Sequence, residues 1–264
     1  MGDVRVMVLR AAGINCDEET MHCWRLVGAA PELWHINAVA DEPGVIDEFS
    51  IVTIPGGFSY GDDIGAGVIL AQRMLHDMKE PLERLVERGG GILGICNGFQ
   101  VLVKLGLLPG GEGGRDEVTV TYNDSAKFEA RWVRLRVETE GCPFLPLPGA
   151  SDSARILEMP VEHAEGRVVT ASDSATERLA ASGAIALRYV DDEGRTDTYP
   201  ANPNGSTAGI AGLCDATGRV LGLMPHPDRN FDHTHHPHWT RRTPTGPPDG
   251  LTIFQNAVVH WQAQ

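Results

Sequence analysis

The stretch that decides the fold is Gly91-Ile92-Leu93-Gly94-Ile95-Cys96-Asn97-Gly98-Phe99-Gln100. An apolar run that is typical of a buried strand stops at Cys96, and the pattern after it predicts a short helix over residues 97–105. Gly94 and Gly98 flank the cysteine two residues away on each side, which is the spacing of a nucleophile elbow with Cys in place of Ser. We expect the turn to expose Cys96 above the carboxyl end of a sheet, where the following helix N-terminus favours a nucleophilic thiolate. The other interpretation of this stretch alone is a buried structural cysteine.

The first half of the chain alternates between strand and helix patterns around this turn. We expect strands at residues 4–9, 33–36, 50–54 and 91–95, and helices at residues 18–28, 68–88 and 97–105. Strands that are separated by helices of this size predict parallel βαβ units, and therefore an α/β fold with a doubly wound, mostly parallel sheet.

The second half has a different pattern from about residue 118. It predicts antiparallel strands at 118–122 and 132–137, and further short strands at 168–171, 184–189 and 208–213. We interpret these as a β-rich extension on one edge of the sheet. A core strand returns at 220–224, a His- and Pro-rich surface loop follows at 229–248, and an amphipathic helix closes the chain at 251–262. Because α/β folds often reach this length undivided, we expect residues 1–264 to form a single domain.

Composition excludes several classes of function. The 264 residues carry a formal net charge of −14, which argues against binding to nucleic acid or to an anionic membrane surface. No run of about 18 apolar residues predicts a membrane span, and the N-terminal stretch lacks the pattern of a signal peptide. The five cysteines are widely spaced without a CxxC motif, which fits thiols of a cytoplasmic protein better than a disulfide framework.

A second motif supplies a base for the cysteine. In Leu221-Gly222-Leu223-Met224-Pro225-His226-Pro227-Asp228, a predicted strand ends at Met224 and places His226 at the same sheet edge as Cys96. Asp228 follows two residues later and is positioned to accept a hydrogen bond from the imidazole. Alone, His-Pro-Asp is more often a loop histidine beside a solvated acid. Together with the elbow, it predicts a Cys-His-acid triad made of Cys96, His226 and Asp228.

A glycine loop supplies candidate donors for an oxyanion. Residues 54–63 read Ile-Pro-Gly-Gly-Phe-Ser-Tyr-Gly-Asp-Asp and follow another predicted core strand. Acyl transfer needs backbone N–H groups that point at the developing negative charge. We expect Gly57 or Phe58 to provide one donor and Asn97, the residue after the nucleophile, to provide the other. An ordinary tight turn is the alternative, and the GxxxxGK[ST] pattern of a phosphate loop is absent.

These segments together resemble the class I, triad-type glutamine amidotransferases. A wider match is similar to the family of glutaminase subunits of phosphoribosylformylglycinamidine synthase, an enzyme of purine biosynthesis. It extends over nearly the whole chain in the right order, at residues 12–17, 55–62, 96–100, 160–167, 202–206 and 224–227. The resemblance implies a flavodoxin-like sheet, and a reaction in which Cys96 attacks the side-chain amide of glutamine while His226 transfers protons and Asp228 orients His226. The family usually has Glu at position 228, and Asp is one methylene shorter.

The resemblance also implies partners and substrate contacts. Ammonia would pass to a separate synthase subunit, which uses ATP and Mg²⁺, and a small accessory subunit would complete the complex; this chain would need no cofactor of its own. Tyr60, Asp62 and Gln100 are candidate contacts to glutamine, with helix packing as the alternative for Gln100. The segment 160–167, with His163 in it, would face the synthase or close the site.

Other hypotheses remain open from the sequence. The chain could serve as the amidotransferase of another pathway, or as a catalytically silent scaffold for a synthase. The histidines at positions 233, 235, 236 and 238 form a dense cluster, which we interpret as a solvated or partner-facing loop. We therefore predict no metal site there, although imidazoles at such spacing do bind zinc in other proteins. Cys16, Cys23, Cys142 and Cys214 are interpreted as packing residues.

Overall fold

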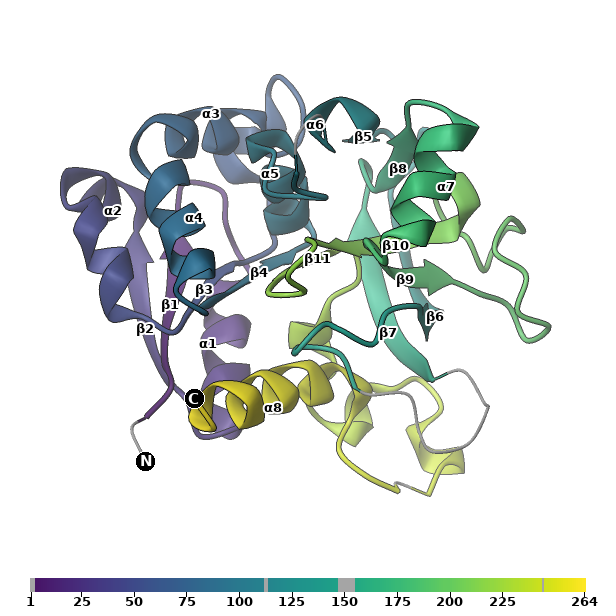
Figure 1. Ribbon diagram of the computed structural model, residues 1–264. Helices are drawn as coiled ribbons and strands as arrows, with labels where there is room; N and C mark the ends of the chain where they lie inside the picture. The colour runs from purple at the N-terminus through teal and green to yellow at the C-terminus, as the bar shows by residue number, and fades with distance from the viewer. Residues whose placement is uncertain (1–2, 112–113, 147–154, 244) are drawn as a thin grey trace.

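The computed structural model describes residues 3–111, 114–146, 155–243 and 245–264. A nine-stranded sheet runs through the molecule (Figure 1). Its strand order is β2 (Ala30–His35), β1 (Arg5–Arg10), β3 (Ile51–Ile54), β4 (Gly91–Ile95), β11 (Val220–Leu223), β10 (Ile210–Cys214), β9 (Ile185–Tyr189), β6 (Glu129–Val137) and β7 (Ile156–His163). The five strands from β2 to β11 are parallel, and the four from β10 to β7 continue the sheet in antiparallel pairs.

Helices cover both faces of the parallel half, as a doubly wound sheet requires. In Figure 1, α3 (Val68–Asp77), α4 (Lys79–Glu87) and α5 (Asn97–Leu105) lie on one side of these strands, and α1 (Asp17–Leu26) and α8 (Asp249–Gln262) lie on the other. The short α2 (Ile36–Asp41) follows the edge strand β2. Every residue of β3, β4 and β11 is buried, which explains why these strands read as continuous apolar runs. The predicted α/β fold with a mostly parallel sheet is therefore confirmed.

The β-rich extension is also present at the predicted edge, but its pairing differs from the expected one. The strand β5 (Val118–Thr121) does not pair with β6; it forms a separate two-stranded sheet with β8 (Arg167–Thr170). The strand β6 pairs instead with β9 and with β7, and the sequence analysis did not predict β7. The extension also contains the short α6 (Gly114–Glu117) and α7 (Asp173–Ala181). The organisation of residues 1–264 as a single domain stays a prediction.

The expectation of one long helix over residues 68–88 is wrong. The segment forms two helices, α3 and α4, that meet at Met78, where the backbone leaves the helical region with φ −122°. Pro81 lies in the first turn of α4. A proline ring collides with the carbonyl group four residues earlier in a continuous helix, here that of Asp77, so the first helix must end at that point. Within the described part of the chain, no helix is long and apolar enough to cross a membrane.

Candidate active site

The turn between β4 and α5 places Cys96 in a strained conformation. Cys96 has φ 50° and ψ −103°, a left-handed region that a residue with a side chain rarely adopts and that costs about 1–3 kcal/mol. Gly98 permits the tight turn, because a Cβ atom at this position would overlap with the carbonyl oxygen of Ile54. The thiol is 5% exposed, and its Sγ lies 3.7 Å from the carbonyl oxygen of Glu162. This geometry is that of a nucleophile elbow.

The strand β11 brings His226 to the same edge of the sheet. It pairs in parallel with β4, with Leu223 opposite Ile95, so the residues after each strand emerge side by side. The Nδ1 atom of His226 lies 3.2 Å from Oδ1 of Asp228, whose side chain is fully buried. The second carboxylate oxygen, Oδ2, lies 3.2 Å from the hydroxyl of the buried Thr20 on α1. Both oxygens of Asp228 thus have a polar neighbour, and the Thr20 hydroxyl also donates to the carbonyl oxygen of Cys16 at 2.6 Å.

Buried charges determine the protonation of His226. Burial by itself lowers the pKa of His226, but the negative charges of Cys96 and Asp228 outweigh it and raise the pKa well above its ordinary value. The Nε2 atom is buried and has no hydrogen-bond partner among the described residues. His226 and Cys96 both line a small cavity of about 90 Å³. The imidazole thus has one nitrogen fixed by an acid and the other available for proton transfer.

The glycine loop passes between the cysteine and the histidine. A Cβ atom at Gly56 would lie 2.7 Å from Cε1 of His226 and 3.5 Å from Cβ of Cys96, so only glycine fits there without moving the imidazole. The amide of Phe58 donates to the carbonyl oxygen of Gly13 at 2.9 Å. Asn97 is the first residue of α5, where helix amides have no intrahelical acceptor. The sequence predicted the amide of Gly57 or of Phe58 as an oxyanion donor. Because the amide of Phe58 already has an acceptor, Gly57 remains as the candidate.

A larger cavity of about 240 Å³ opens beside Cys96. Asp62 and Gln100 line it together with Cys96. The four residues from Glu162 to Glu165, at the end of β7 and directly after it, line it as well. The side chain of Asn97 connects Asp62 and Gln100, because its Nδ2 lies 3.2 Å from Asp62 Oδ1 and 2.9 Å from Gln100 Oε1. Gln100 in turn donates to the carbonyl oxygen of Glu165. Burial raises the pKa of Asp62, an effect to which the nearby charge of Glu165 adds.

The third predicted substrate contact lies elsewhere. The hydroxyl of Tyr60 accepts a hydrogen bond from Arg73 at 2.8 Å, and Tyr60 is not among the residues that line the cavity. Tyr60 is nevertheless in a left-handed conformation, with φ 54°, within the loop that shapes the site. The structure therefore brings Asp62 and Gln100 to Cys96 and directs Tyr60 toward a surface arginine.

The sequence analysis missed two residues of the site, Cys16 and Arg229. Cys16 lines the small cavity with Cys96, and its Sγ lies 3.5 Å from Nη2 of Arg229. Ligand-capable atoms of Cys16, His226 and Asp228 all lie within 4.8 Å of one another. The interpretation of Cys16 as a packing residue therefore does not describe its surroundings. The available signal was its place in the loop 12–17, one of the segments that carry the resemblance.

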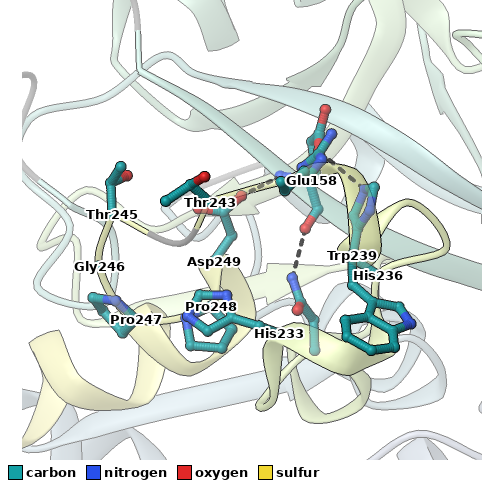
Figure 2. Close-up of a pocket in the computed structure, with 12 residues that line it drawn as sticks. Glu158, His233, His236, Trp239, Thr243, Thr245, Gly246, Pro247, Pro248 and Asp249 are labelled. Carbon is teal, nitrogen blue, oxygen red and sulfur yellow. Dashed lines mark hydrogen bonds and ion pairs between the residues drawn. The ribbon is translucent and has the colours of Figure 1, made fainter.

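The histidine-rich loop forms a second pocket of about 210 Å³, shown in Figure 2. Glu158 of β7 lines it and pairs with Arg242 and with Nε2 of His236 at 3.2 Å. The backbone of Glu158 donates to Asp249 at 2.9 Å and accepts from Asn230 at 2.7 Å. Within the described residues, the loop histidines do not gather into a group of metal-ligating atoms. Position 244 of the predicted loop lies outside the described residues.

Comparison with known proteins adds independent information. A family model described as a CobB/CobQ-like glutamine amidotransferase domain matches residues 3–261. The chain is 41% identical to the phosphoribosylformylglycinamidine synthase subunit PurQ of Dehalococcoides mccartyi, with 100% of both chains covered. It is 41% identical to the PurQ subunit of Archaeoglobus fulgidus, over 87% of this chain and 88% of that one.

Solved structures agree with these relatives. The fold superimposes on a chain from the structure of PurLQS from Thermotoga maritima with a TM-score of 0.72 and 30% identity, covering 98% of this chain and 100% of that one. A glutamine amidotransferase from the same organism matches with a TM-score of 0.54 at 13% identity, which supports the fold alone.

Proposed function

Because the chain belongs to the family of CobB/CobQ-like glutamine amidotransferase domains, we propose that it is the glutaminase subunit of a phosphoribosylformylglycinamidine synthase. It hydrolyses glutamine to glutamate and ammonia for purine biosynthesis. The observation that carries the proposal is the convergence of Cys96 and His226 on one cavity, with Asp228 bonded to the far side of the imidazole.

The chemistry follows from this geometry. The Cys96 thiolate attacks the side-chain amide carbon of glutamine, and the carbonyl oxygen becomes negatively charged. The protonated His226 delivers its proton from Nε2 to the nitrogen, the C–N bond breaks, and ammonia leaves a γ-glutamyl thioester on Cys96. Water then attacks the thioester while His226 accepts a proton, and glutamate is released with the thiolate restored. Asp228 keeps the imidazole oriented and stabilises its positive charge throughout.

Two backbone amides stabilise the oxyanion in this proposal. The amide of Asn97 stands at the start of α5, directly after the nucleophile, and Gly57 lines both cavities beside Cys96. Phe58 is set aside as a donor because its amide already bonds to Gly13. A helix N-terminus adds a favourable dipole for the negative charge.

The larger cavity is the proposed glutamine site. Its carboxylate-rich wall, with Asp62 and Glu165, suits the α-ammonium group of the substrate, and Gln100 holds the wall in place through the carbonyl oxygen of Glu165. Tyr60 supports the loop from outside through Arg73 and does not contact glutamine in this assignment.

The partners belong to the same proposal. The Thermotoga maritima relative comes from the structure of PurLQS, and we assign this chain a synthase subunit and a small accessory subunit as partners. The synthase would use ATP and Mg²⁺ with the ammonia, and this chain would bind no cofactor. An ATP-using partner and five free thiols fit a cytoplasmic location.

Covalent labelling tests the proposal. Wild type, Cys96→Ala and Cys16→Ala are incubated with a diazo-ketone analogue of glutamine, with the synthase present, and the adducts are located by mass spectrometry. We expect one adduct on Cys96 in the wild type and in Cys16→Ala, blocked by excess glutamine, and none in Cys96→Ala. An unlabelled Cys96, or a label on another cysteine, would contradict the glutaminase function and favour the silent scaffold.

A further inference from the structure

His163 has a buried nitrogen that the proposed reaction does not yet use. It ends β7, its side chain is 3% exposed, and it lines the larger cavity together with Cys96. Its Nε2 atom is buried and finds no hydrogen-bond partner among the residues that the structure describes. Buried polar atoms are nearly always paired, so an unpaired one on a residue that lines this cavity points to a partner that arrives with the substrate.

The hydrogen bonds of Asn123 fix which nitrogen of His163 carries the proton. The Nδ2 atom of Asn123 donates to the carbonyl oxygens of Lys127 and His163, at 2.8 and 2.9 Å. Its Oδ1 atom accepts from the amide of Gly166 at 3.0 Å and lies 3.1 Å from Nδ1 of His163. Because this oxygen only accepts, we assign the ring hydrogen to Nδ1. The Nε2 atom therefore has a lone pair and is a hydrogen-bond acceptor.

The imidazole of His163 keeps this form at physiological pH. Burial lowers the pKa of His163 to about 3, and the neighbouring charge of His226 lowers it in the same direction. The two histidines of the site are thus opposite in character. The acid Asp228 supports a positive charge on His226, whereas His163 faces an amide oxygen and stays neutral.

The substrate provides the donor that the acceptor lacks. The carboxamide of glutamine has two N–H bonds on the nitrogen that departs, and its position next to Cys96 is set by the attack on the amide carbon. We propose that Nε2 of His163 accepts a hydrogen bond from the carboxamide nitrogen of glutamine and makes His163 a specificity-determining residue for the amide. This inference rests on the proposed glutaminase function.

The assignment explains how glutamine is distinguished from its product. A lone pair attracts the NH₂ group of glutamine and repels a carboxylate oxygen of glutamate at the same place. A site that is built to bond a substrate N–H also discriminates against analogues that lack it, because its polar atom is then left unpaired. The γ-methyl ester of glutamate is such an analogue, since its leaving oxygen has no hydrogen.

A pair of variants separates the two nitrogens of His163. Asn places an amide nitrogen near the position of Nδ1, so His163→Asn keeps the bond to Asn123 and loses the acceptor. Gln reaches the position of Nε2, so His163→Gln keeps an acceptor there. Both are assayed in the assembled complex with glutamine and with the γ-methyl ester. We expect the glutamine-to-ester ratio of kcat/KM to fall about tenfold in His163→Asn and to be largely retained in His163→Gln.

Equal losses for both substrates would overturn the inference, because they would indicate a purely structural role. No loss of kcat/KM for either substrate in His163→Asn would overturn it as well. Labelling of Cys96 by the diazo-ketone analogue is measured in each variant, so that failure of the glutaminase function is distinguished from failure of the His163 assignment. Should the variants not fold, ¹⁵N NMR of Cys96→Ala gives a second test. The resonance of His163 is recognised because this imidazole stays neutral in mild acid. Its Nε2 resonance must shift when glutamine is added and must not shift when the ester is added.

Discussion

Two pockets of this molecule each contain a histidine paired with a carboxylate, and they differ in what remains unpaired. In the histidine-rich loop, the Glu158 carboxylate lies between His236 and Arg242, and the guanidinium of Arg242 compensates its charge (Figure 2). Beside Cys96, Asp228 holds one nitrogen of His226 and the other nitrogen has no partner among the described residues. The ion pairs of Glu158 hold a loop against the sheet, whereas the imidazole beside Cys96 keeps one nitrogen without a partner, as a site that is prepared for a substrate requires.

The largest expected effect comes from removing the nucleophile. Cys96→Ala should lower glutamine hydrolysis at least about 10⁴-fold, because no thioester can form. Turnover is measured as glutamate release by the assembled complex. Cys214→Ala is the matched control: this cysteine is equally buried, lies on β10 away from the site, and should retain turnover. A comparable loss of turnover in both variants would show that the effect of Cys96→Ala comes from disturbing the core and not from removing a nucleophile.

The next effect concerns the acid. Asp228→Asn should lower kcat about 10³–10⁴-fold, because the amide no longer supports the imidazolium. The negative charge of Asp228 helps to raise the pKa of His226, so its removal should also lower that pKa and move the basic limb of the pH–rate profile to lower pH. Asp228→Glu keeps the charge and should be intermediate. A profile that does not move would show that Asp228 acts by packing alone.

A smaller effect is expected at the residue that holds the acid from behind. Thr20→Val keeps the shape of the side chain but removes the hydroxyl, which lies 3.2 Å from Oδ2 of Asp228 and donates to the carbonyl oxygen of Cys16 at 2.6 Å. Turnover should fall about tenfold and the free energy of unfolding by about 1–3 kcal/mol. Thr20→Ser retains the hydroxyl and should approach wild type in both measurements. If Thr20→Ser is as slow as Thr20→Val, the methyl group and not the hydroxyl is responsible.

The smallest effect on turnover is expected in the loop pocket. Glu158→Gln should leave glutamine hydrolysis within about twofold and lower the free energy of unfolding by about 1 kcal/mol. Burial raises the pKa of Glu158, but the bond to Arg242 and nearby positive charges lower it further, so the net pKa is depressed. Its contribution to stability is therefore present at neutral pH and lost as pH falls through the depressed value. The midpoint temperature of thermal unfolding should fall more steeply with decreasing pH in the wild type than in Glu158→Gln. Parallel dependences on pH would contradict this.

Local patterns predicted most of what surrounds the nucleophile. The elbow at Cys96, the following helix over residues 97–105 and the His-Pro-Asp segment are short and contiguous, so their spacing survives in the fold. The break between α3 and α4 was not predicted, although the sequence contains its cause: Pro81 cannot continue a helix through Asp77. The predicted triad itself stays a prediction about chemistry, which the proposed experiments address.

Contacts between distant segments were beyond the sequence. The strand β7 alternates apolar residues with Glu158 and Glu162, but Pro160 in its middle argues against a strand, and yet it pairs along its whole length with β6. Cys16 meets Arg229 across more than 200 residues of chain, and no spacing rule connects them. The orphaned nitrogen of His163 likewise becomes visible only when Asn123, from another segment, fixes the orientation of the ring.

The place of β11 between β4 and β10 has a consequence for how the protein is made. The proposed nucleophile is translated at position 96, but its proposed base and the strand that closes the open edge of β4 are translated more than 120 residues later, with His226. A chain that is still being synthesised, or one that is released early by damage to its message, thus contains a cysteine with no proton carrier. In the proposed reaction, a chain without residue 226 cannot release ammonia, so activity would begin only when the centre of the sheet has been filled.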